Sequence, residues 1–92
     1  MDDERASAEL ETVVPAAHYG RVDTLFVPLW HQVWGSLDAS TGSIEVDEEP
    51  GPDNQDLLDL AAVHTLRNDG TVYPVEIEAI PGSGGIAAIF RY

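Results

Sequence analysis

The sequence contains no cysteine and no lysine, and its only permanently cationic side chains are four arginines. The absence of cysteine excludes disulfide bonds, thiolate metal sites and a cysteine nucleophile. Four arginines cannot form the basic surface that nucleic-acid-binding proteins present to phosphates. Anionic membrane surfaces are disfavoured for the same reason. We therefore expect neither a nucleic acid nor a membrane among the direct partners.

The sequence also lacks the marks of a membrane or secreted protein. No apolar run approaches the roughly 20 residues that a helix needs to span a bilayer. The chain begins with Met1-Asp2-Asp3-Glu4, whereas a secretory signal begins with basic residues. These features predict a cytoplasmic protein.

Acidic residues dominate what is present, because 17 Asp and Glu give a formal net charge of −13. An acidic surface without lysine suits a high-salt cytoplasm, follows from the codon usage of a GC-rich genome, or matches one basic partner. The sequence leaves these three explanations open. In each case self-repulsion favours solubility and costs some stability at low salt.

The length of 92 residues fits one domain, and 43% hydrophobic residues are enough to form a core. Residues 1–8 are polar and predict a flexible lead-in, so the domain itself is expected to cover residues 9–92. The spacing of Leu10, Val13, Val14 and Ala17 predicts a helix over residues 7–20. Pro15 should kink this helix or start a second one, and Gly20 should end it.

The middle of the chain predicts three strands. Residues 22–27 are nearly all apolar, which is typical of a strand buried on both faces. Residues 33–38 and 43–47 flank a four-residue loop in which Gly42 can adopt a left-handed conformation, so they predict a hairpin at one edge of the sheet.

The second half of the chain predicts one helix and two strands. Asp53 should cap a helix over residues 54–68, with Asp56 completing a capping box, and Gly70 should follow its end. Strands are expected over residues 71–77 and 86–92, the latter with Ala88 and Phe90 on one face and Ala87, Ile89 and Arg91 on the other.

The expected element order is therefore α-β-β-β-α-β-β. Strands that are apolar on both faces need cover on both faces, and the two helices are the available covers. We therefore predict a small α/β/α sandwich with a mixed sheet.

The histidines, acids and glycines show no recognised catalytic or metal-binding spacing. His18, His31 and His64 are far apart in sequence, and the acidic run Asp47-Glu48-Glu49 lacks the spacing of a calcium loop. The Gly82–Gly85 segment precedes a strand and has no lysine, so it predicts a turn rather than a phosphate loop. We expect no cofactor, no metal and no enzymatic activity.

Trp30, His31 and Trp34 form the most aromatic segment of the chain. They either pack in the fold or form a hot spot for a partner, in which tryptophan is favoured. Arg91 stands in an apolar strand and should pair with a carboxylate of this domain, or else contact a neighbouring domain or partner.

Two segments resemble one protein family when they are taken together. Ala16–Val27 (AAHYGRVDTLFV) resembles the signature ALxxGAVxTLLV in the third domain of archaeo-eukaryotic class-one peptide release factors and Pelota. Gly84–Tyr92 (GGIAAIFRY) resembles the closing GGIAAILRY of the same domain, and Gly70–Val75 fits the step from helix through glycine to strand between them. The resemblance covers residues 9–92 and is greatest to the bacterial and archaeal release-factor-like homologues.

The resemblance implies the fold of the kink-turn-binding ribosomal proteins, in which a mixed sheet lies between helices. Gly20, Gly70, Gly84, Gly85 and Arg91 are expected to be structural positions, from the helix ends, the turn and the pairing described above. The family's catalytic Gly-Gly-Gln loop belongs to its middle domain, and Gly84-Gly85 is followed here by Ile86. The family's third domain docks proteins, including a translational GTPase, so the resemblance implies a piece of a longer, ribosome-associated protein.

We therefore expect a non-catalytic docking domain that acts in translation termination or ribosome rescue. Its partners would be other domains of the parent chain, a translational GTPase or a ribosome component. The expected docking residues are Trp30, His31, Trp34, Asp47, Glu48 and Glu49. The alternative is a stand-alone acidic protein that mimics nucleic acid and occupies a basic protein, whereas a small hydrolase finds no support in the sequence.

The net charge predicts how stability responds to salt. Moderate NaCl screens the repulsion between carboxylates, so the melting temperature should rise as NaCl is added to a low-salt buffer. Differential scanning calorimetry across a NaCl series measures this response. A flat or falling melting temperature would contradict the prediction.

Overall fold

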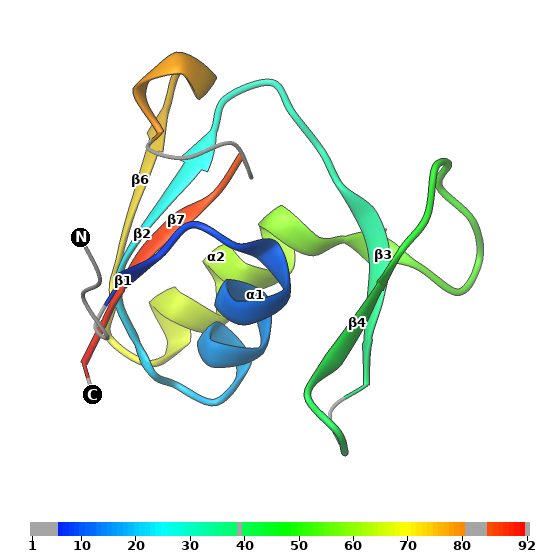
Figure 1. Ribbon diagram of the computed structural model, residues 1–92, viewed down its shortest axis with the longest axis horizontal. Coiled ribbons are helices and arrows are strands. Elements are labelled where there is room, and N and C mark those ends of the chain that lie inside the picture. Colours follow the sequence, from blue (N-terminus) through cyan, green and yellow to red (C-terminus); the bar gives the residue numbers. More distant parts are fainter. Residues whose placement is uncertain (1–5, 39, 81–84, 92) are drawn as a thin grey trace.

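The computed structural model describes residues 6–38, 40–80 and 85–91, and these ranges form a mixture of helices and short strands (Figure 1). In the first half of the chain the elements are β1 (Ala6–Ser7), α1 (Leu10–His18), β2 (Val22–Pro28), β3 (Trp34–Asp38) and β4 (Ser43–Val46). In the second half they are β5 (Gln55–Asp56), α2 (Leu57–Arg67), β6 (Thr71–Val75), the 3-10 turn η1 (Ile77–Ala79) and β7 (Ala87–Phe90). None of the described helices is long and apolar enough to span a bilayer.

The larger sheet has the strand order β1-β7-β2-β6. β2 pairs in parallel with β6 and antiparallel with β7, so the sheet is mixed. This confirms the predicted α/β class with a mixed sheet. Pro74 is tolerated within β6 because β6 is an edge strand, where a missing N–H need not break the ladder.

Two short pairings escaped the sequence prediction. Ala6 and Ser7 pair with Ile89 and Ala88 as strand β1, although residues 1–8 were expected to form a lead-in. Gln55 pairs with Gly35, so β5 forms where the second helix was expected to begin. Pairings of two residues carry no periodicity that a sequence pattern could reveal.

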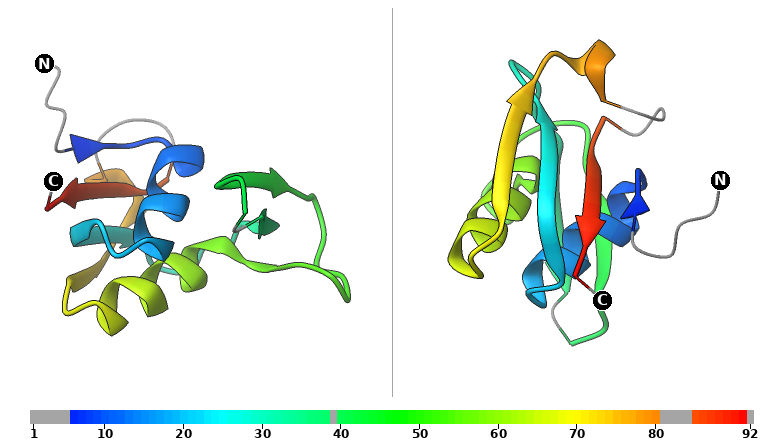
Figure 2. Two further views of the ribbon diagram at one scale, coloured as in Figure 1. Left: turned by 90° about the horizontal axis from the view of Figure 1, so that it is seen from below. Right: turned by 90° about the vertical axis from the view of Figure 1, so that its left-hand side faces the viewer.

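The predicted hairpin forms, but not at an edge of the main sheet. β3 pairs antiparallel with β4 and with β5, giving a separate sheet of order β4-β3-β5. Gly42 has a φ of 74°, as the predicted turn requires. This second sheet lies beyond the helices, on the side away from the four-stranded sheet (Figure 2, left).

The two helices lie on one face of the four-stranded sheet, rather than on opposite faces as predicted (Figure 2, right). α1 packs against α2, and both contact β2. The opposite face of β2 is less apolar than the sequence run suggests, because Asp23 is exposed and Thr24 half-buried. A register shift between Val22 and Thr24 also breaks the simple alternation of faces.

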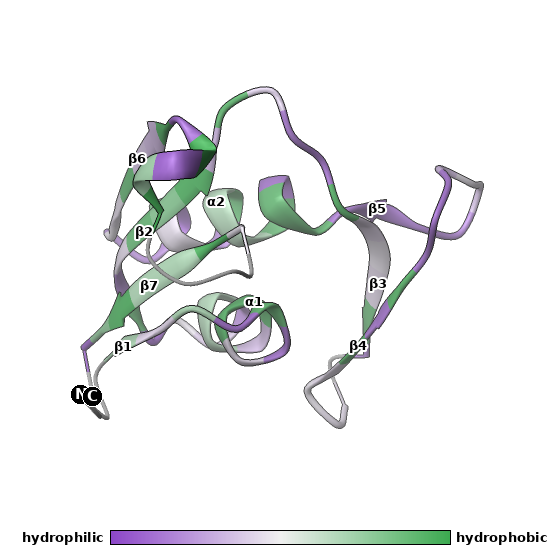
Figure 3. Ribbon diagram, turned by 45° about the horizontal axis from the view of Figure 1, so that its top comes forward, coloured by the Kyte–Doolittle hydropathy of each residue, from purple (hydrophilic) through white to green (hydrophobic). Residues whose placement is uncertain are grey.

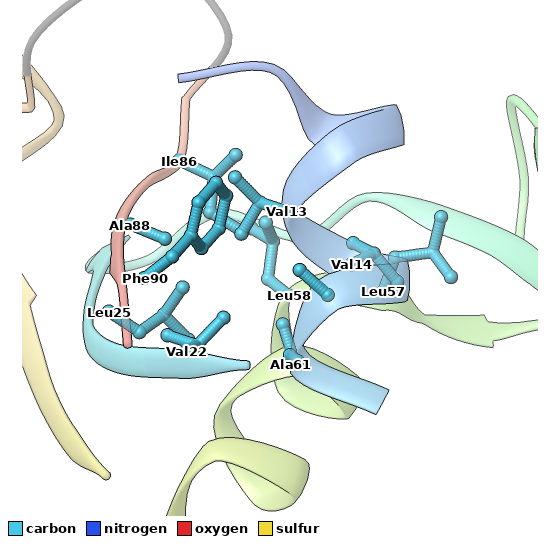
Figure 4. Packing of buried hydrophobic residues seen from close by; sticks show 12 residues of the cluster. Val13, Val14, Val22, Leu25, Leu57, Leu58, Ala61, Ile86, Ala88 and Phe90 are labelled. Atoms are coloured by element: carbon cyan, nitrogen blue, oxygen red, sulfur yellow. The ribbon is translucent and has the colours of Figure 1, made fainter. Parts of the chain in front are cut away.

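The core lies between the helices and the inner face of the sheet (Figure 4). Burial of each large aliphatic side chain there contributes about 1.5–3 kcal/mol before the loss of conformational entropy is counted. Ala88 and Phe90 face the core, and Ile89 points away from it, as predicted from alternation. The buried cluster includes Val13, Val14, Ala17, Val22, Leu25, Leu57, Leu58, Ala61, Ile86, Ala88 and Phe90.

Pro15 does not divide α1, which runs without interruption from Leu10 to His18. Proline cannot donate to the carbonyl of Glu11, but that residue is in the first turn and exposed, so water can satisfy its carbonyl. The carbonyl of Pro15 itself keeps its helical bond, since Tyr19 N donates to Pro15 O over 3.0 Å.

α2 begins at Leu57 with Asp56, not Asp53, as its N-cap. Asp56 Oδ1 accepts hydrogen bonds from Leu58 N (3.0 Å) and from Val33 N (3.1 Å). The same carboxylate therefore caps the helix and holds the segment that leads into β3.

Gly70 allows β6 to start very close to α2. A Cβ atom at this position would lie 2.6 Å from Thr65 Cγ2 and 2.8 Å from Val22 O. The second atom belongs to the backbone of the central strand and cannot move aside easily. Gly70 is therefore required by a close approach of elements.

The Gly70→Ala variant should be destabilised by about 1–3 kcal/mol, because the added methyl forces backbone or buried side chains to shift. Urea unfolding followed by circular dichroism measures this loss. Gly51→Ala is the matched control, since a Cβ there would meet only Asn54 Nδ2, at 3.8 Å. Equal stability of the two variants would contradict the close-approach argument.

Candidate functional site

The connection between β2 and β3 presents Trp30 to solvent in an unusual backbone conformation. Its side chain is 90% exposed and its φ is 66°. A bulky residue in this left-handed region costs about 1–3 kcal/mol. Leu29 N donates to Val75 O over 2.8 Å, so pairing with β6 continues up to the residue before Trp30. The fold thus fixes the chain immediately before an outward-facing tryptophan.

His31 is also exposed, and its Nδ1 lies 2.7 Å from Leu29 O. In the tautomer protonated at Nδ1, the ring donates to this carbonyl and closes the turn around Trp30. His31 therefore supports the conformation that exposes Trp30, in addition to being exposed itself.

Trp34 differs from Trp30 because it is half-buried at the start of β3. Its carbonyl accepts a hydrogen bond from Asp47 N over 2.7 Å, and it is paired in register with Asp56. The structure therefore brings Trp34 next to the start of the acidic loop, while Trp30 lies nearer the end of β6.

The acidic loop between β4 and β5 is exposed and hydrophilic (Figure 3). Asp47, Glu48 and Glu49 are all exposed. Asn54 organises the loop, because its Nδ2 donates to Asp47 Oδ2 (2.9 Å) and to Glu49 O (3.0 Å), and its Oδ1 accepts from Gly51 N (2.8 Å). Within the described ranges, no three His, Asp or Glu side chains are grouped so that they could hold a metal ion.

At the tip of the hairpin, Asp38 Oδ1 accepts hydrogen bonds from Ser40 Oγ (2.6 Å) and Ser40 N (3.0 Å). These bonds stabilise the ionised carboxylate and lower the pKa of Asp38. They fix the turn, and the exposed position of Asp38 makes it a surface group.

Asn68 is a structural residue that the sequence did not single out. It is the C-cap of α2; its Nδ2 donates to His64 O over 2.8 Å, and its carbonyl accepts from Arg91 Nη2. A Cβ on Gly20, whose φ is 75°, would lie 3.0 Å from Asn68 Oδ1. Asn68 therefore joins the ends of α1, α2 and β7. A lone asparagine after a helix signals a cap but not these distant partners.

Among the described residues, Arg91 bonds backbone carbonyls rather than the predicted carboxylate. Besides Asn68 O, its Nε lies 3.4 Å from Val22 O, and its own N donates to Arg21 O over 2.8 Å. Gly85 has a φ of 71°, so a turn before β7 uses it as expected. Gly84 lies outside the described residues.

A pair of histidines, also unforeseen from the sequence, joins the two helices. The rings of His18 and His64 meet edge to face with centroids 4.9 Å apart, and His18 meets Tyr19 in the same way at 5.0 Å. His18 Nδ1 is buried without a hydrogen-bond partner among the described residues. Burial lowers the pKa of His64 below its ordinary value of 6.5, and the charges of His18 and Arg67 lower this pKa further.

The lowered pKa of His64 predicts acid sensitivity of the fold. The unfolded chain binds a proton near pH 6.5 and the folded chain only at lower pH, so stability is full above this value and falls as the pH drops below it. Unfolding measured by urea titration between pH 8 and the onset of carboxylate protonation, about pH 5, tests this. His64→Gln should flatten the dependence, whereas His31→Gln, at an exposed site outside the helix contact, should preserve it. An unchanged slope in His64→Gln would contradict the assignment.

Comparisons with known proteins identify the fold through a solved structure. No protein-family model matches the chain, and no curated protein matches it. Among solved structures, the chain is similar to the C-terminal domain of Peptide Chain Release Factor from Methanosarcina mazei, with a TM-score of 0.68 and 19% sequence identity. The match covers 99% of this chain and 72% of that one. The fold is therefore the one that the sequence resemblance implied, the fold of a release-factor C-terminal domain.

Proposed function

We propose that this chain is a non-catalytic protein-docking domain of a release-factor-like, ribosome-associated protein in the cytoplasm. It would act in translation termination or rescue by holding other domains of its parent protein, a translational GTPase or a ribosome component. Similarity of fold to the archaeal release-factor domain over 99% of the chain supports a role in translation. A role without catalysis is supported by the sequence, because Gly84-Gly85 is followed by Ile86 rather than by glutamine.

The exposure of Trp30 is the single observation that carries the docking role. The side chain is 90% exposed in a backbone conformation that disfavours large residues. Covering a tryptophan removes about 150–250 Å² from water, which is worth about 4–6 kcal/mol before the costs of association. Because the Trp30 side chain buries so little surface within the domain, burial against a partner would contribute most of its stabilising free energy.

Trp30→Ala should abolish most of the docking while leaving the domain folded. We expect affinity for purified ribosomes or for a purified translational GTPase of the source organism to fall by at least about tenfold, which is typical of a hot-spot residue. Sedimentation and fluorescence anisotropy measure this binding. The melting temperature should be unchanged or higher, because alanine tolerates the left-handed conformation at lower steric cost than tryptophan.

Leu66→Ala is the matched control, because Leu66 is a 59% exposed apolar residue on α2. It should bind as the unchanged chain does. Trp34→Ala should weaken binding only if the domain stays folded, and unfolding of this variant would assign Trp34 to the folded scaffold. Equal binding by Trp30→Ala and the unchanged chain would refute the docking role of this tryptophan.

The same assay tests the nucleic-acid-mimic alternative. A mimic would bind a basic nuclease or DNA-binding protein tightly, and NaCl would weaken that complex steeply. Such binding, with no affinity for ribosomes or the GTPase, would overturn the translation role.

A further inference from the structure

The outer face of the four-stranded sheet carries an apolar surface that no described helix covers. Both helices lie behind the sheet when this face is viewed directly (Figure 2, right). Tyr73, Phe26 and Ala87 stand side by side in register on β6, β2 and β7. Tyr73 is 49% exposed and Ile89 is 43% exposed, whereas Phe26 is half-buried and Ala87, only 4% exposed, lies between its larger neighbours. We call Phe26, Tyr73, Ala87 and Ile89 the outer sheet surface.

Two aromatic rings give the outer sheet surface a flat platform. Phe26 and Tyr73 stack with ring centroids 5.6 Å apart and planes 20° from parallel. Such a pair is held by its own packing, so its exposed faces are presented without a further ordering cost. Flat aromatic faces attract guanidinium groups and apolar side chains.

A hollow of about 360 Å³ lies beside this platform. Ala6, Ala8 and Ala87 line it together with the larger Phe26 and Ile89. Ala6 is paired with Ile89 across β1 and β7, so small and large residues alternate over this part of the sheet. With Ala88, four alanines line the hollow, and their small side chains leave room for an incoming apolar side chain.

The charge around this surface selects the kind of partner. Glu9 follows β1, and Glu76 and Glu78 follow β6, and all three side chains are exposed. The chain as a whole carries a net charge of −13. The negative potential around this apolar surface repels anions and raises the local concentration of cations. The complementary partner is therefore both cationic and apolar.

We propose that the outer sheet surface docks an arginine-rich, apolar segment of a partner protein. An apolar side chain of that segment occupies the hollow, and neighbouring guanidinium groups stack on Phe26 and Tyr73 or face the glutamates. This surface is separate from Trp30 and does not depend on a role in translation, so it goes beyond the function proposed above.

Single-stranded RNA is the competing occupant, because exposed aromatic residues on a sheet can also stack bases. Each bound phosphate requires a cation, however, and the sequence has only four arginines. Arg91, which stands at the end of β7, already bonds the carbonyls of Val22 and Asn68. The observations favour a basic peptide over RNA.

The test is a nuclear magnetic resonance titration of the full chain at low salt. The probe is a short peptide that alternates arginine and leucine, compared with an arginine–glycine peptide, a glutamate–leucine peptide and a short oligouridylate. We expect saturable shifts only with the arginine–leucine peptide, centred on the amides of Phe26, Tyr73, Ala87 and Ile89 and weakened by NaCl. No binding, equal binding of the arginine–glycine peptide, tighter binding of the oligouridylate, or shifts centred on the acidic loop would each overturn the proposal.

Variants separate this surface from the rest of the molecule. Ile89→Arg should weaken the peptide by about tenfold, because it fills the edge of the hollow and adds a like charge. Leu66→Arg adds the same charge at an exposed position on α2 and should leave the affinity unchanged. Tyr73→Ala removes the stacked platform without adding charge, and should also weaken binding if Ile89→Arg fails to fold. Loss of peptide binding in Trp30→Ala would place the peptide at Trp30 and refute the assignment to the sheet. If the chain does not bind ribosomes through Trp30, the proposed function fails but the peptide site on the outer sheet surface is unaffected.

Discussion

The packing of α1 against α2 on one face of the mixed sheet decides which surfaces this domain has available. The helices bury Val13, Val14, Leu57 and Leu58 against the inner faces of β2 and β7, and so use the apolar faces of both helices on a single core. No helix among the described elements remains to cover the outer face of the sheet, where Tyr73 and Ile89 stay exposed. The same packing of the helices therefore forms the core and leaves Tyr73 and Ile89 without cover from a described helix.

The start of α2 also holds the second sheet in place. Asp56 caps α2 and at the same time bonds Val33 N, which fixes the approach of the chain to β3. The carbonyl of Trp34 then accepts a hydrogen bond from Asp47 N, which fixes the start of the acidic loop.

The sequence predicted what depends on local periodicity and missed what depends on distant partners. The spacing of Leu10, Val13, Val14 and Ala17 identified α1, and the alternation of Ala88, Ile89 and Phe90 identified β7 with the correct faces. The layer order was wrong because an apolar run such as residues 22–27 reports burial without saying which element provides it. The bond from Val33 N to Asp56 and the bonds of Arg91 to Val22 and Asn68 join residues far apart in sequence, which a single sequence does not reveal. The sequence singled out Trp30 because tryptophan is favoured at binding sites, whereas its exposure became evident only from the backbone conformation in the structure.

The acidic residues and the exposed apolar residues together determine which partners this domain can bind. An acidic surface alone repels other anions and discriminates poorly among cations, and an apolar surface alone favours self-association. On this domain, the field of the acidic residues opposes pairing of two copies through the outer sheet surface, since both copies carry −13. Burial of Tyr73, Ile89 or Trp30 then rewards a basic partner that also supplies apolar contact. The acidity thus favours partners of opposite charge at the apolar surfaces and disfavours RNA, whose phosphates require cations from the protein surface.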